Sequence, residues 1–336
     1  MGKSQQKSMF TNEDLKRLQS LDLDNKIQIS LTRITEFYNR FDGKVYIAFS
    51  GGKDSTVLLD LVRHVYPDTL AVFCDTGLEY PEIREFINTK NNVKFLYPVL
   101  FNQSTKQYDK ISFREVLERY GYPIISKEVA GIIEDARHVN MFKTDSYRIK
   151  RLNGELLDKN GNYSSFNCPQ WKFLVDAPFK ISNKCCDRMK KIPSKVFQRE
   201  SNLHPILGTM ASESRLRKQQ WLRNGCNIFN SKEPKSNPLS FWTEQDILKY
   251  ITRFQIPIAS VYGEVLQDKN GKYYTSGISR SGCIYCMFGC HLEKEPNRFQ
   301  RLKKTHPQLY EYCLKPWDEG GLGMKEVLDF INVKYE

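Results

Sequence analysis

Six consecutive residues carry the clearest chemical signal in the sequence: Ser50, Gly51, Gly52, Lys53, Asp54 and Ser55. They follow an apolar run at 44–49 and precede an amphipathic pattern, so we expect a turn between a strand and a helix. Glycines let backbone N–H groups approach a phosphate, and a helix N-terminus adds unpaired donors and a partial positive charge. Lys53 adds a cation. The spacing is not that of the Walker loop, but it predicts a site for nucleotide phosphates.

The elements that must position this turn follow from the pattern of apolar residues. We expect strands at 44–49, 70–74 and 92–97, and helices at 28–40, 112–120, 127–139 and 244–254. A further core strand is expected from His204, and Thr243 is the expected N-cap of the helix at 244–254. Strands that alternate with helices form right-handed βαβ units. The sequence therefore predicts an α/β, Rossmann-like domain with a mostly parallel sheet.

A parallel sheet of this kind binds its ligand at the carboxyl ends of the strands. The turn after 44–49 and the turn after 70–74 are therefore expected to be two walls of one site. Asp75, Thr76 and Gly77 form the second turn, where a ribose or an adenine edge would be held. For Asp75, a role as a helix-capping residue is the open alternative.

Two groups of cysteines, about a hundred residues apart, suggest a metal site. Cys185 and Cys186 form one group, and Cys283, Cys286 and Cys290 form the other. Structural disulfides are rare in a reducing compartment, whereas four thiolates are enough for Zn²⁺ or a 4Fe–4S cluster. The tandem pair favours iron–sulfur, with Zn²⁺ as the alternative. The expected ligands are Cys185, Cys186, Cys283 and Cys286, with Cys290 as a competing ligand.

The expected organisation has three parts. Residues 1–27 form an N-terminal arm or cap, 28–257 form the nucleotide-binding domain, and 258–336 form a cysteine-cluster and basic helical module. An irregular insert is expected at about 140–183. Asp158–Gly161 and Asp268–Gly271 both read Asp-Lys-Asn-Gly, which is a hairpin turn signal.

The charge of the chain points to a polyanionic partner. The formal net charge is +12, from 51 basic and 39 acidic residues. The segment 180–199 is strongly basic, so DNA or RNA is an expected partner beside the nucleotide. No apolar run approaches the roughly 18 to 20 residues that cross a bilayer, so we expect no membrane association and a cytoplasmic location.

Taken together, these motifs resemble the phosphoadenosine-phosphosulfate reductase family of the PP-loop ATP pyrophosphatase superfamily. The likeness lies in residues 50–55, 75–81, 208–215 and 242–247, and it spans about 44 to 262. Cys185, Cys186, Cys283 and Cys286 extend it, because they are similar to the iron–sulfur ligands of the adenylylsulfate-reducing branch. Met189 stands where that branch has arginine.

The resemblance implies an enzyme that binds ATP, or an adenylylated sulfate, with Mg²⁺. It would cleave ATP between the α- and β-phosphates and use the adenylylated intermediate in sulfur transfer. Lys53, Asp54 and Arg215 are the implied catalytic residues, and Gly208 and Arg217 join the binding residues. Asp54 would either hold Mg²⁺ or cap the helix, and the two arginines would either hold phosphate or sulfate or form a solvated helix face. A cysteine desulfurase or a thiol reductant is the implied sulfur or electron donor.

One departure separates the chain from the reductases of this family. They use a nucleophilic cysteine in a Glu-Cys-Gly-hydrophobic-His motif near the C-terminus, and the last cysteine here is Cys313, in Glu-Tyr-Cys-Leu-Lys. This favours members that kept the ATP site and the cluster for another purpose, such as the DNA phosphorothioation enzyme. The alternatives are an adenylylsulfate or phosphoadenylylsulfate reductase that releases sulfite, and a nonenzymatic, zinc-stabilised nucleic-acid-binding protein.

Overall fold

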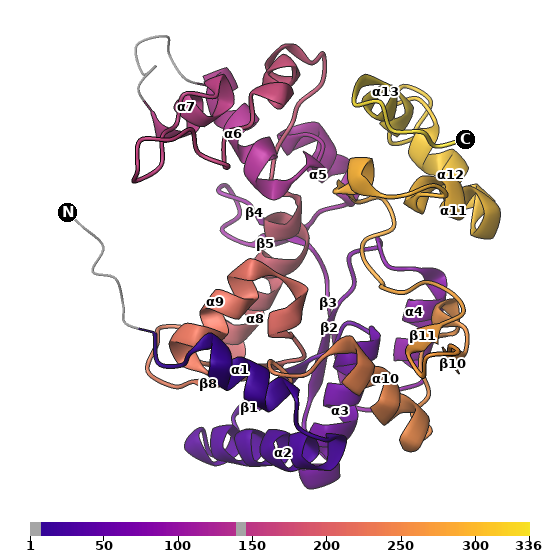
Figure 1. Cartoon of the computed structure of the whole chain (residues 1–336). Coiled ribbons are helices and arrows are strands. Elements are labelled where there is room, and N and C mark those ends of the chain that lie inside the picture. The colour runs from indigo at the N-terminus through magenta and orange to yellow at the C-terminus, as the bar shows by residue number, and fades with distance from the viewer. Residues whose placement is uncertain (1–7, 139–145) are drawn as a thin grey trace. The chain divides into compact units, whose positions relative to one another are not determined.

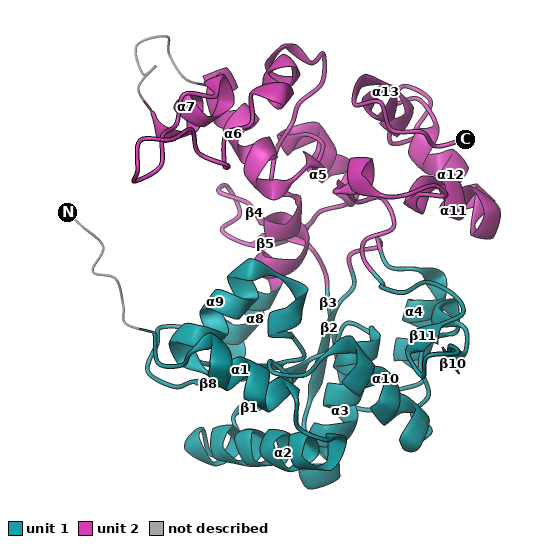
Figure 2. Ribbon diagram, viewed as in Figure 1, with its two compact units in different colours: residues 1–75, 79–96, 194–281 teal, residues 76–78, 97–193, 282–336 magenta. Residues whose placement is uncertain are grey.

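The computed structural model describes residues 8–138 and 146–336. The first seven residues of the expected arm, the last residue of the expected helix at 127–139 and positions 140–145 of the expected insert lie outside the described residues. The backbone divides into two compact units (Figure 2). Unit 1 comprises 1–75, 79–96 and 194–281, and unit 2 comprises 76–78, 97–193 and 282–336.

Unit 1 is built on a six-stranded sheet with the order β3-β2-β1-β7-β9-β8. Its strands are β1 (Val45–Ala48), β2 (Ala71–Cys74), β3 (Val93–Leu96), β7 (His204–Leu207), β8 (Asn227–Ile228) and β9 (Lys235–Ser236). Every neighbouring pair is parallel except β8 with β9. The predicted α/β fold with a mostly parallel sheet is therefore confirmed, and the strands expected in the first hundred residues are all present.

The helices of unit 1 are α1 (Asn12–Gln19), α2 (Leu23–Arg40), α3 (Lys53–Val65), α4 (Pro81–Asn88), α9 (Arg215–Asn224) and α10 (Glu244–Arg253), labelled in Figure 1. Helix α8 (Ile192–Ser201) begins at the end of unit 2 and continues in unit 1. α2 begins five residues before the expected start at 28, because Asp22 caps it by accepting from the Asn25 N–H at 2.8 Å. The expected cap at Thr243 is confirmed, with Asp246 completing a capping box.

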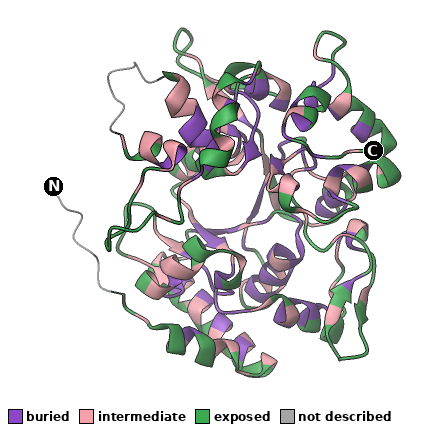
Figure 3. Cartoon of the chain, turned by 45° about the horizontal axis from the view of Figure 1, so that its top comes forward, coloured by how far each residue is buried: buried purple, intermediate pink, exposed green. Residues whose placement is uncertain are grey.

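Successive residues of β1 point to opposite faces of the sheet, and both faces are covered. Val45 and Ile47 belong to the large core that includes residues of α2, α3 and α10. Tyr46 lies on the other face, where its ring meets that of Phe197 from α8 at 5.3 Å between centroids. This double burial explains why the strand is apolar at almost every position. Figure 3 shows the buried residues in purple along the strands and the inner sides of the helices.

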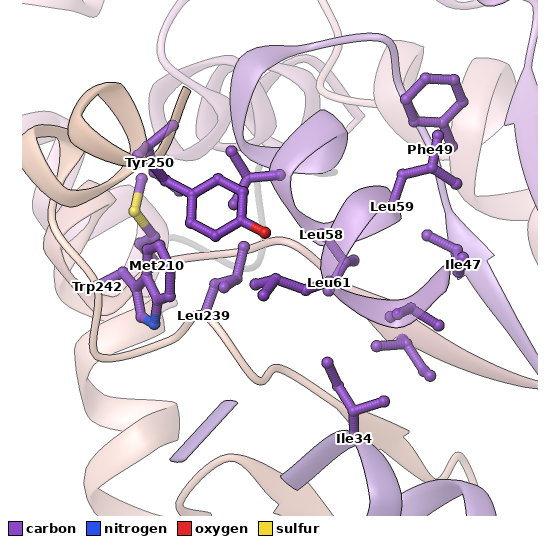
Figure 4. Close-up of a cluster of buried hydrophobic side chains, with 14 of the residues drawn as sticks. Ile34, Ile47, Phe49, Leu58, Leu59, Leu61, Met210, Leu239, Trp242 and Tyr250 are labelled. Carbon is purple, nitrogen blue, oxygen red and sulfur yellow. The ribbon is translucent and has the colours of Figure 1, made fainter. Parts of the chain in front are cut away.

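Helix α3 is the best-anchored element beside the sheet. Leu58 and Leu61 are buried in the core together with Ile34 of α2 (Figure 4). Trp242, also buried, donates through Nε1 to Ser30 Oγ at 2.9 Å. Burial of each leucine-sized side chain contributes about 1.5–3 kcal/mol relative to exposure. The N-terminus of α3, which follows the 50–52 turn, is therefore held by a rigid frame.

Unit 1 also contains several short elements. The 3₁₀ turns Ala211–Glu213 and Ser260–Tyr262 flank the sheet, and β10 (Val265–Gln267) pairs with β11 (Tyr273–Thr275) in an antiparallel hairpin. The turn at Asp268–Gly271 joins these two strands, so this hairpin prediction is confirmed. Gln245 fastens the hairpin to α10, because its side chain accepts from the Tyr273 N–H and donates to the Tyr273 C=O, both at 2.8 Å.

Unit 2 consists mainly of helices and short strand pairs. Its helices are α5 (Phe113–Tyr120), α6 (Lys127–His138), α7 (Tyr147–Asn153), a 3₁₀ helix (Pro169–Asp176), a π-helix (Asp187–Lys191), a 3₁₀ turn (Cys290–Leu292), α11 (Arg298–Thr305), α12 (Pro307–Leu314) and α13 (Met324–Phe330). Its strands are β4 (Val99–Phe101), β5 (Tyr108–Lys110), β6 (Ile124–Ile125) and β12 (Met287–Phe288). Leu157 and Tyr163 form an antiparallel bridge on either side of Asp158–Gly161. The other predicted hairpin turn is therefore also confirmed.

Candidate nucleotide site and cysteine group

The turn between β1 and α3 depends on a glycine that no other residue can replace without strain. Gly51 has φ = +70°, in the left-handed region. A Cβ built on it would lie 2.7 Å from Ile83 Cγ2 and 2.9 Å from Ile87 Cδ1. The turn is therefore pressed against α4. Gly52 is the N-cap of α3 and makes no side-chain cap bond, so the first N–H groups of the helix have no capping side chain there.

The two serines of the turn hold its shape. The Ser50 N–H donates to Ser55 Oγ at 3.2 Å, and Ser55 Oγ donates to the Gly52 C=O at 2.9 Å. Thr56 Oγ1 donates to the same carbonyl at 3.0 Å. These bonds fold the chain back on itself at the start of α3, so the hydroxyl groups of Ser55 and Thr56 stabilise the turn.

A cavity of about 520 Å³ lies at the carboxyl ends of β1 and β7. The chain leaves β1 toward β2 on one side and places β7 on the other, so this is the point where the strand order reverses. Ligands of open α/β sheets bind at such points, and the volume suits a small molecule. The predicted site residues that line it are Ser50, Gly52, Lys53, Asp54, Ser55, Gly208 and Arg217.

Gly208 sets the spacing between the two walls of the cavity. A Cβ at this position would lie 3.0 Å from the backbone oxygen of Asp54. The main chain after β7 thus approaches the first turn of α3 as closely as glycine permits. A larger residue would push the two walls apart.

In this cavity the wall opposite the 50–55 turn is formed by residues that follow β7. Asp75 is buried and its Oδ2 accepts from Arg84 Nη2 at 2.7 Å. Thr76 Oγ1 accepts from the Leu78 N–H at 3.2 Å, and Gly77 has φ = +71°. None of these three residues is among the described residues that line the cavity. Strand β7, far away in the sequence, is the second neighbour of β1 in the sheet, so it brings residues to this cavity that the sequence analysis did not place there.

Two further predicted residues, Gly51 and Arg215, are also not among the described residues that line the cavity. Gly51 packs on α4, as given above. Arg215 is the first residue of α9, and Arg217 lies two positions later on the same helix, whose N-cap is Ser214. Of the two predicted arginines, the structure brings only Arg217 to the cavity.

Lys53 is buried in the wall of the cavity and already has two partners. Its Nζ donates to Glu244 Oε1 at 3.0 Å and to the Ser279 C=O at 2.6 Å. It also lies 5.5 Å from the ring centroid of Tyr262. The cation is thus neutralised by a carboxylate that is itself half-exposed.

The carboxyl group of Asp54 titrates abnormally. Burial, and to a smaller extent the negative charge of Glu213, raises its pKa to about 6. Lys53 and Arg280 act in the opposite direction, and Glu244 adds to the rise. At pH 7 the group is mostly ionised but close to its titration range. Perturbed carboxyls in a cavity are candidates for ligand or metal binding.

Several residues of the cavity were not singled out from the sequence. They come from two places: Thr209, Ser212 and Glu213 follow β7, and Glu244, Tyr262, Ser279, Arg280 and Ser281 come from the last third of unit 1. Glu213 was noted only as part of a motif. The signal available for Arg280 was its place two residues before Gly282 and three before Cys283. Nothing local indicated that the chain returns there to the 50–55 turn.

The cysteine group lies in unit 2. Burial raises the pKa of the Cys185 thiol strongly, and the neighbouring thiols Cys186, Cys283 and Cys286 add to the rise. The four expected ligands are thus near enough to one another to interact. Cys290 is buried, and burial raises its pKa to about 11; its thiol neighbour is Cys286.

Each of the two cysteine segments adjoins a short element of regular structure. Cys186 is the N-cap of the π-helix Asp187–Lys191, and π-helical turns occur frequently at functional sites. On the other segment, β12 follows Cys286 directly and pairs with β6 in a parallel bridge. Arg298 Nη1 donates to the Cys286 C=O at 2.5 Å. Charged neighbours of the thiols are Lys127, Lys190 and Arg298.

The thiols of Cys185, Cys186, Cys283 and Cys286 are donors that either Zn²⁺ or a 4Fe–4S cluster would use. All nine cysteines are free thiols. Within residues 8–138 and 146–336, no three His, Cys, Asp or Glu side chains are grouped closely enough to hold one metal ion. The nearby cations would offset the charge of four thiolates.

Cys313 is enclosed in unit 2. Its side chain is fully buried, its Sγ donates to the Tyr310 C=O at 3.1 Å, and burial raises its pKa to about 12. A thiol of this kind is neither ionised near neutral pH nor accessible.

Many of the basic residues near the cysteines are paired within the chain. Lys191 lies 2.6 Å from Asp187, Arg298 lies 2.6 Å from Glu293, and Arg301 reaches the same carboxyl group at 3.4 Å. Part of the positive charge is thus already balanced. No helix in the described part of the chain has the length and apolar character needed to cross a bilayer.

Comparisons with known proteins identify similar sequences. A family model described as the phosphoadenosine phosphosulfate reductase domain matches residues 44–121 and 155–308. The adenosine 5'-phosphosulfate reductase of Geobacillus sp. (strain WCH70) is 26% identical over 268 residues, which are 78% of this chain and 81% of the relative. The enzyme of the same name from Anoxybacillus flavithermus is 24% identical over 312 residues, 90% of this chain and 100% of the relative.

A solved structure is also similar to the chain. It is the crystal structure of phosphoadenylyl-sulfate reductase from Candida auris in a phosphate complex, with 14% identity and a TM-score of 0.38. The match covers 78% of this chain and 98% of that chain.

Proposed function

Because the chain belongs to the phosphoadenosine phosphosulfate reductase family, we propose that it binds an adenine nucleotide in the cavity of unit 1 and reacts at its phosphate chain. The relatives support an enzyme of the sulfonucleotide-related class. The observation that carries the proposal is the position of the 50–55 turn, whose Lys53 and uncapped helix N-terminus line a cavity where the strand order reverses.

We assign ATP with Mg²⁺ as the substrate and adenylylation as the reaction. An oxygen of the acceptor attacks the α-phosphorus, the bond from that phosphorus to the bridging oxygen breaks, and pyrophosphate leaves with the bonding electrons. Lys53 and the first N–H groups of α3 stabilise the charge that grows on the leaving group. Asp54, ionised above its pKa of about 6, is the carboxylate that we assign to Mg²⁺. Arg217 binds the phosphate chain from the β7 side.

The adenylylated product then serves sulfur transfer. This choice over sulfite release is supported by Cys313, which is fully buried and protonated. The acceptor that we favour is a nucleic acid, which suits the net charge of +12. A cysteine desulfurase or a thiol reductant would supply sulfur or electrons.

Cys185, Cys186, Cys283 and Cys286 are the residues that we assign to a 4Fe–4S cluster, with Zn²⁺ as the alternative. Such a cluster, when bound, supplies a site for electrons or sulfur. Lys190 and Arg298 provide positive charge beside these thiols, which favours the thiolate form that any metal requires.

The experiment is product analysis with the full chain purified without oxygen. Incubation with ATP, Mg²⁺, nucleic acid as the acceptor and a sulfur donor is expected to give AMP and pyrophosphate in equal amounts, whereas ADP and phosphate alone would contradict adenylylation. Lys53→Ala is expected to reduce the rate about 100-fold, in line with the loss of one stabilising donor. Lys249→Ala, an exposed lysine of α10, is the matched control.

A reductase is the second candidate, because both relatives described above carry that name. It predicts sulfite from adenosine 5'-phosphosulfate when a thiol reductant is present. Sulfite release without any pyrophosphate formation from ATP would replace our proposal by this one. If Cys313→Ser leaves that release unchanged, Cys313 is excluded as the attacking thiol.

A further inference from the structure

Three consecutive residues, Ser279 to Ser281, contact the nucleotide cavity at three points. The Ser279 C=O accepts from Lys53 Nζ at 2.6 Å, and Arg280 Nη2 donates to Glu213 Oε1 at 2.5 Å. Ser281 Oγ accepts from the Tyr262 hydroxyl at 2.5 Å. A Cβ built on Gly52 would lie 3.1 Å from that Ser281 oxygen. This tripeptide therefore forms a wall directly above the N-terminus of α3.

Glu213 joins this wall to the opposite one. Its Oε2 accepts from the Met210 N–H at 2.8 Å and from Arg217 Nη1, and its Oε1 accepts from Arg280. Its side chain is only 12% exposed, whereas those of Arg217 and Arg280 are 42% and 61% exposed. A nearly buried carboxylate thus holds two accessible arginines that both line the cavity.

We propose that Arg280 binds an anionic group of the nucleotide, and that Glu213 is the positioning residue that sets Arg280 and Arg217 side by side for this purpose. The inference rests on the proposed function and adds a second anion subsite to it. Each bond to Glu213 uses one terminal nitrogen of the arginine, and a guanidinium carries five N–H donors in all. Donors therefore remain for a phosphate or sulfate oxygen.

The arrangement of charges defines the class of ligand. Lys53 and the N-terminus of α3 offer one anion subsite, and the Arg217–Arg280 pair offers another on the side of Glu213. A ligand that fills both has at least two linked anionic groups, as in a polyphosphate or a phosphosulfate anhydride. A nucleoside monophosphate fills only one.

The hydrogen bonds of Glu213 distinguish it from a carboxylate that only competes with the ligand for the arginine side chains. It accepts bonds from a backbone N–H and from two side chains, so moving it breaks all three. The side chain of Glu244, in contrast, is 52% exposed, and it forms an ion pair with Lys53. Loss of the Glu213 charge is therefore expected to release the arginines and weaken ligand binding.

Calorimetric titration of the full chain with ATP, AMP and inorganic pyrophosphate tests the proposal. Arg280→Ala is expected to weaken ATP and pyrophosphate binding about tenfold, the usual loss for a hydrogen bond to a charged group, and AMP binding less than twofold. Arg280→Lys is expected to restore part of the loss. Arg253→Ala, an exposed arginine of α10 paired with Asp24, is the matched control and is expected to bind like the unmodified chain.

Glu213→Gln isolates the positioning role. We expect it to weaken ATP binding about tenfold in the unmodified chain and to add nothing when Arg217 and Arg280 are both alanine, because coupled residues are not additive. Equal loss in both backgrounds, or unchanged ATP binding by Arg280→Ala, overturns the inference. If the unmodified chain binds neither ATP nor pyrophosphate, the proposed function itself fails, which is a separate result.

Discussion

Lys53 Nζ lies 3.0 Å from Glu244 Oε1, although the two residues are 191 positions apart in the sequence. The lysine of the 50–55 turn is thus neutralised by the first residue of α10. A polyphosphate that enters the cavity must compete with the Glu244 carboxylate for Lys53, or bind together with a cation that pairs with this carboxylate. The pair therefore affects affinity and not only local stability.

The first prediction concerns this competition. Glu244→Gln removes the negative charge while keeping the size of the side chain, so Lys53 is free to meet the ligand. Because the carboxylate is half-exposed, the pair is worth at most about 1 kcal/mol, and affinity for pyrophosphate should rise about two- to fivefold. Titration calorimetry without Mg²⁺ measures this. Weaker binding would mean that Glu244 assists the ligand, for example by holding a metal ion.

The second prediction concerns Gly51. Gly51→Ala is expected to cost about 1 kcal/mol for the left-handed φ and a further 1–3 kcal/mol for the collision with Ile83 and Ile87. Urea unfolding gives the difference in free energy. Gly161→Ala is the matched control, because its φ is +81° and no heavy atom lies within 4 Å of the added Cβ. If the two variants lose the same stability, the contact with α4 contributes nothing.

The third prediction follows from the titration of Asp54. Its pKa in the folded protein, about 6, lies above its model value of 3.8. The folded state then binds more protons than the unfolded state between these values, so this group lowers stability as the pH rises from about 4 to about 6. Asp54→Asn removes the effect and should stabilise the protein at pH 7, on the order of 2–3 kcal/mol.

The same variant should give only a small gain at pH 4, where Asp54 is protonated in the folded protein and only partly ionised in the unfolded chain. Unfolding free energies at pH 4, 5, 6 and 7 measure the difference between variant and unmodified chain. A difference that stays constant over this range would show that the carboxyl group titrates normally. If Asp54→Asn gains stability but loses ATP turnover, this would fit a residue that is retained for function at a cost in stability.

The fourth prediction concerns the cysteine group. Protein purified without oxygen is expected to contain iron and sulfide, and Cys185→Ser is expected to lose most of both because it removes the most buried of the four assigned ligands. Metal analysis and visible absorption measure this. Cys74→Ala, in unit 1, is the control. Zinc without sulfide would replace the iron–sulfur assignment by the alternative.

The sequence predicted local features well where the cause is local. The 50–55 turn and its position between β1 and α3 follow from two glycines between an apolar run and a helical pattern, and Thr243 was recognisable as an N-cap. Both Asp-Lys-Asn-Gly turns form hairpin bridges. In each case the residues that determine the conformation are within a few positions of one another.

Features that depend on distant contacts were missed. The second wall of the cavity follows from the pairing of β1 with β7, whose residues Val45 and His204 lie side by side. Arg280 reaches Glu213 only because the chain returns to the sheet after the β10–β11 hairpin. No periodicity or local propensity encodes such a return. The 50–55 motif identifies one wall of the cavity, and the order of the strands in the sheet determines which residues form the opposite wall.

The close approach of the main chain at Gly208 affects how the cavity can change in evolution. Two stretches of main chain, and not two side chains, fix the width of the chamber at this point. Substitutions at the rim of the cavity can therefore change its charge and its selectivity, while the width set by the main chain stays the same. A single bulkier residue at this one position would be enough to remodel the chamber itself.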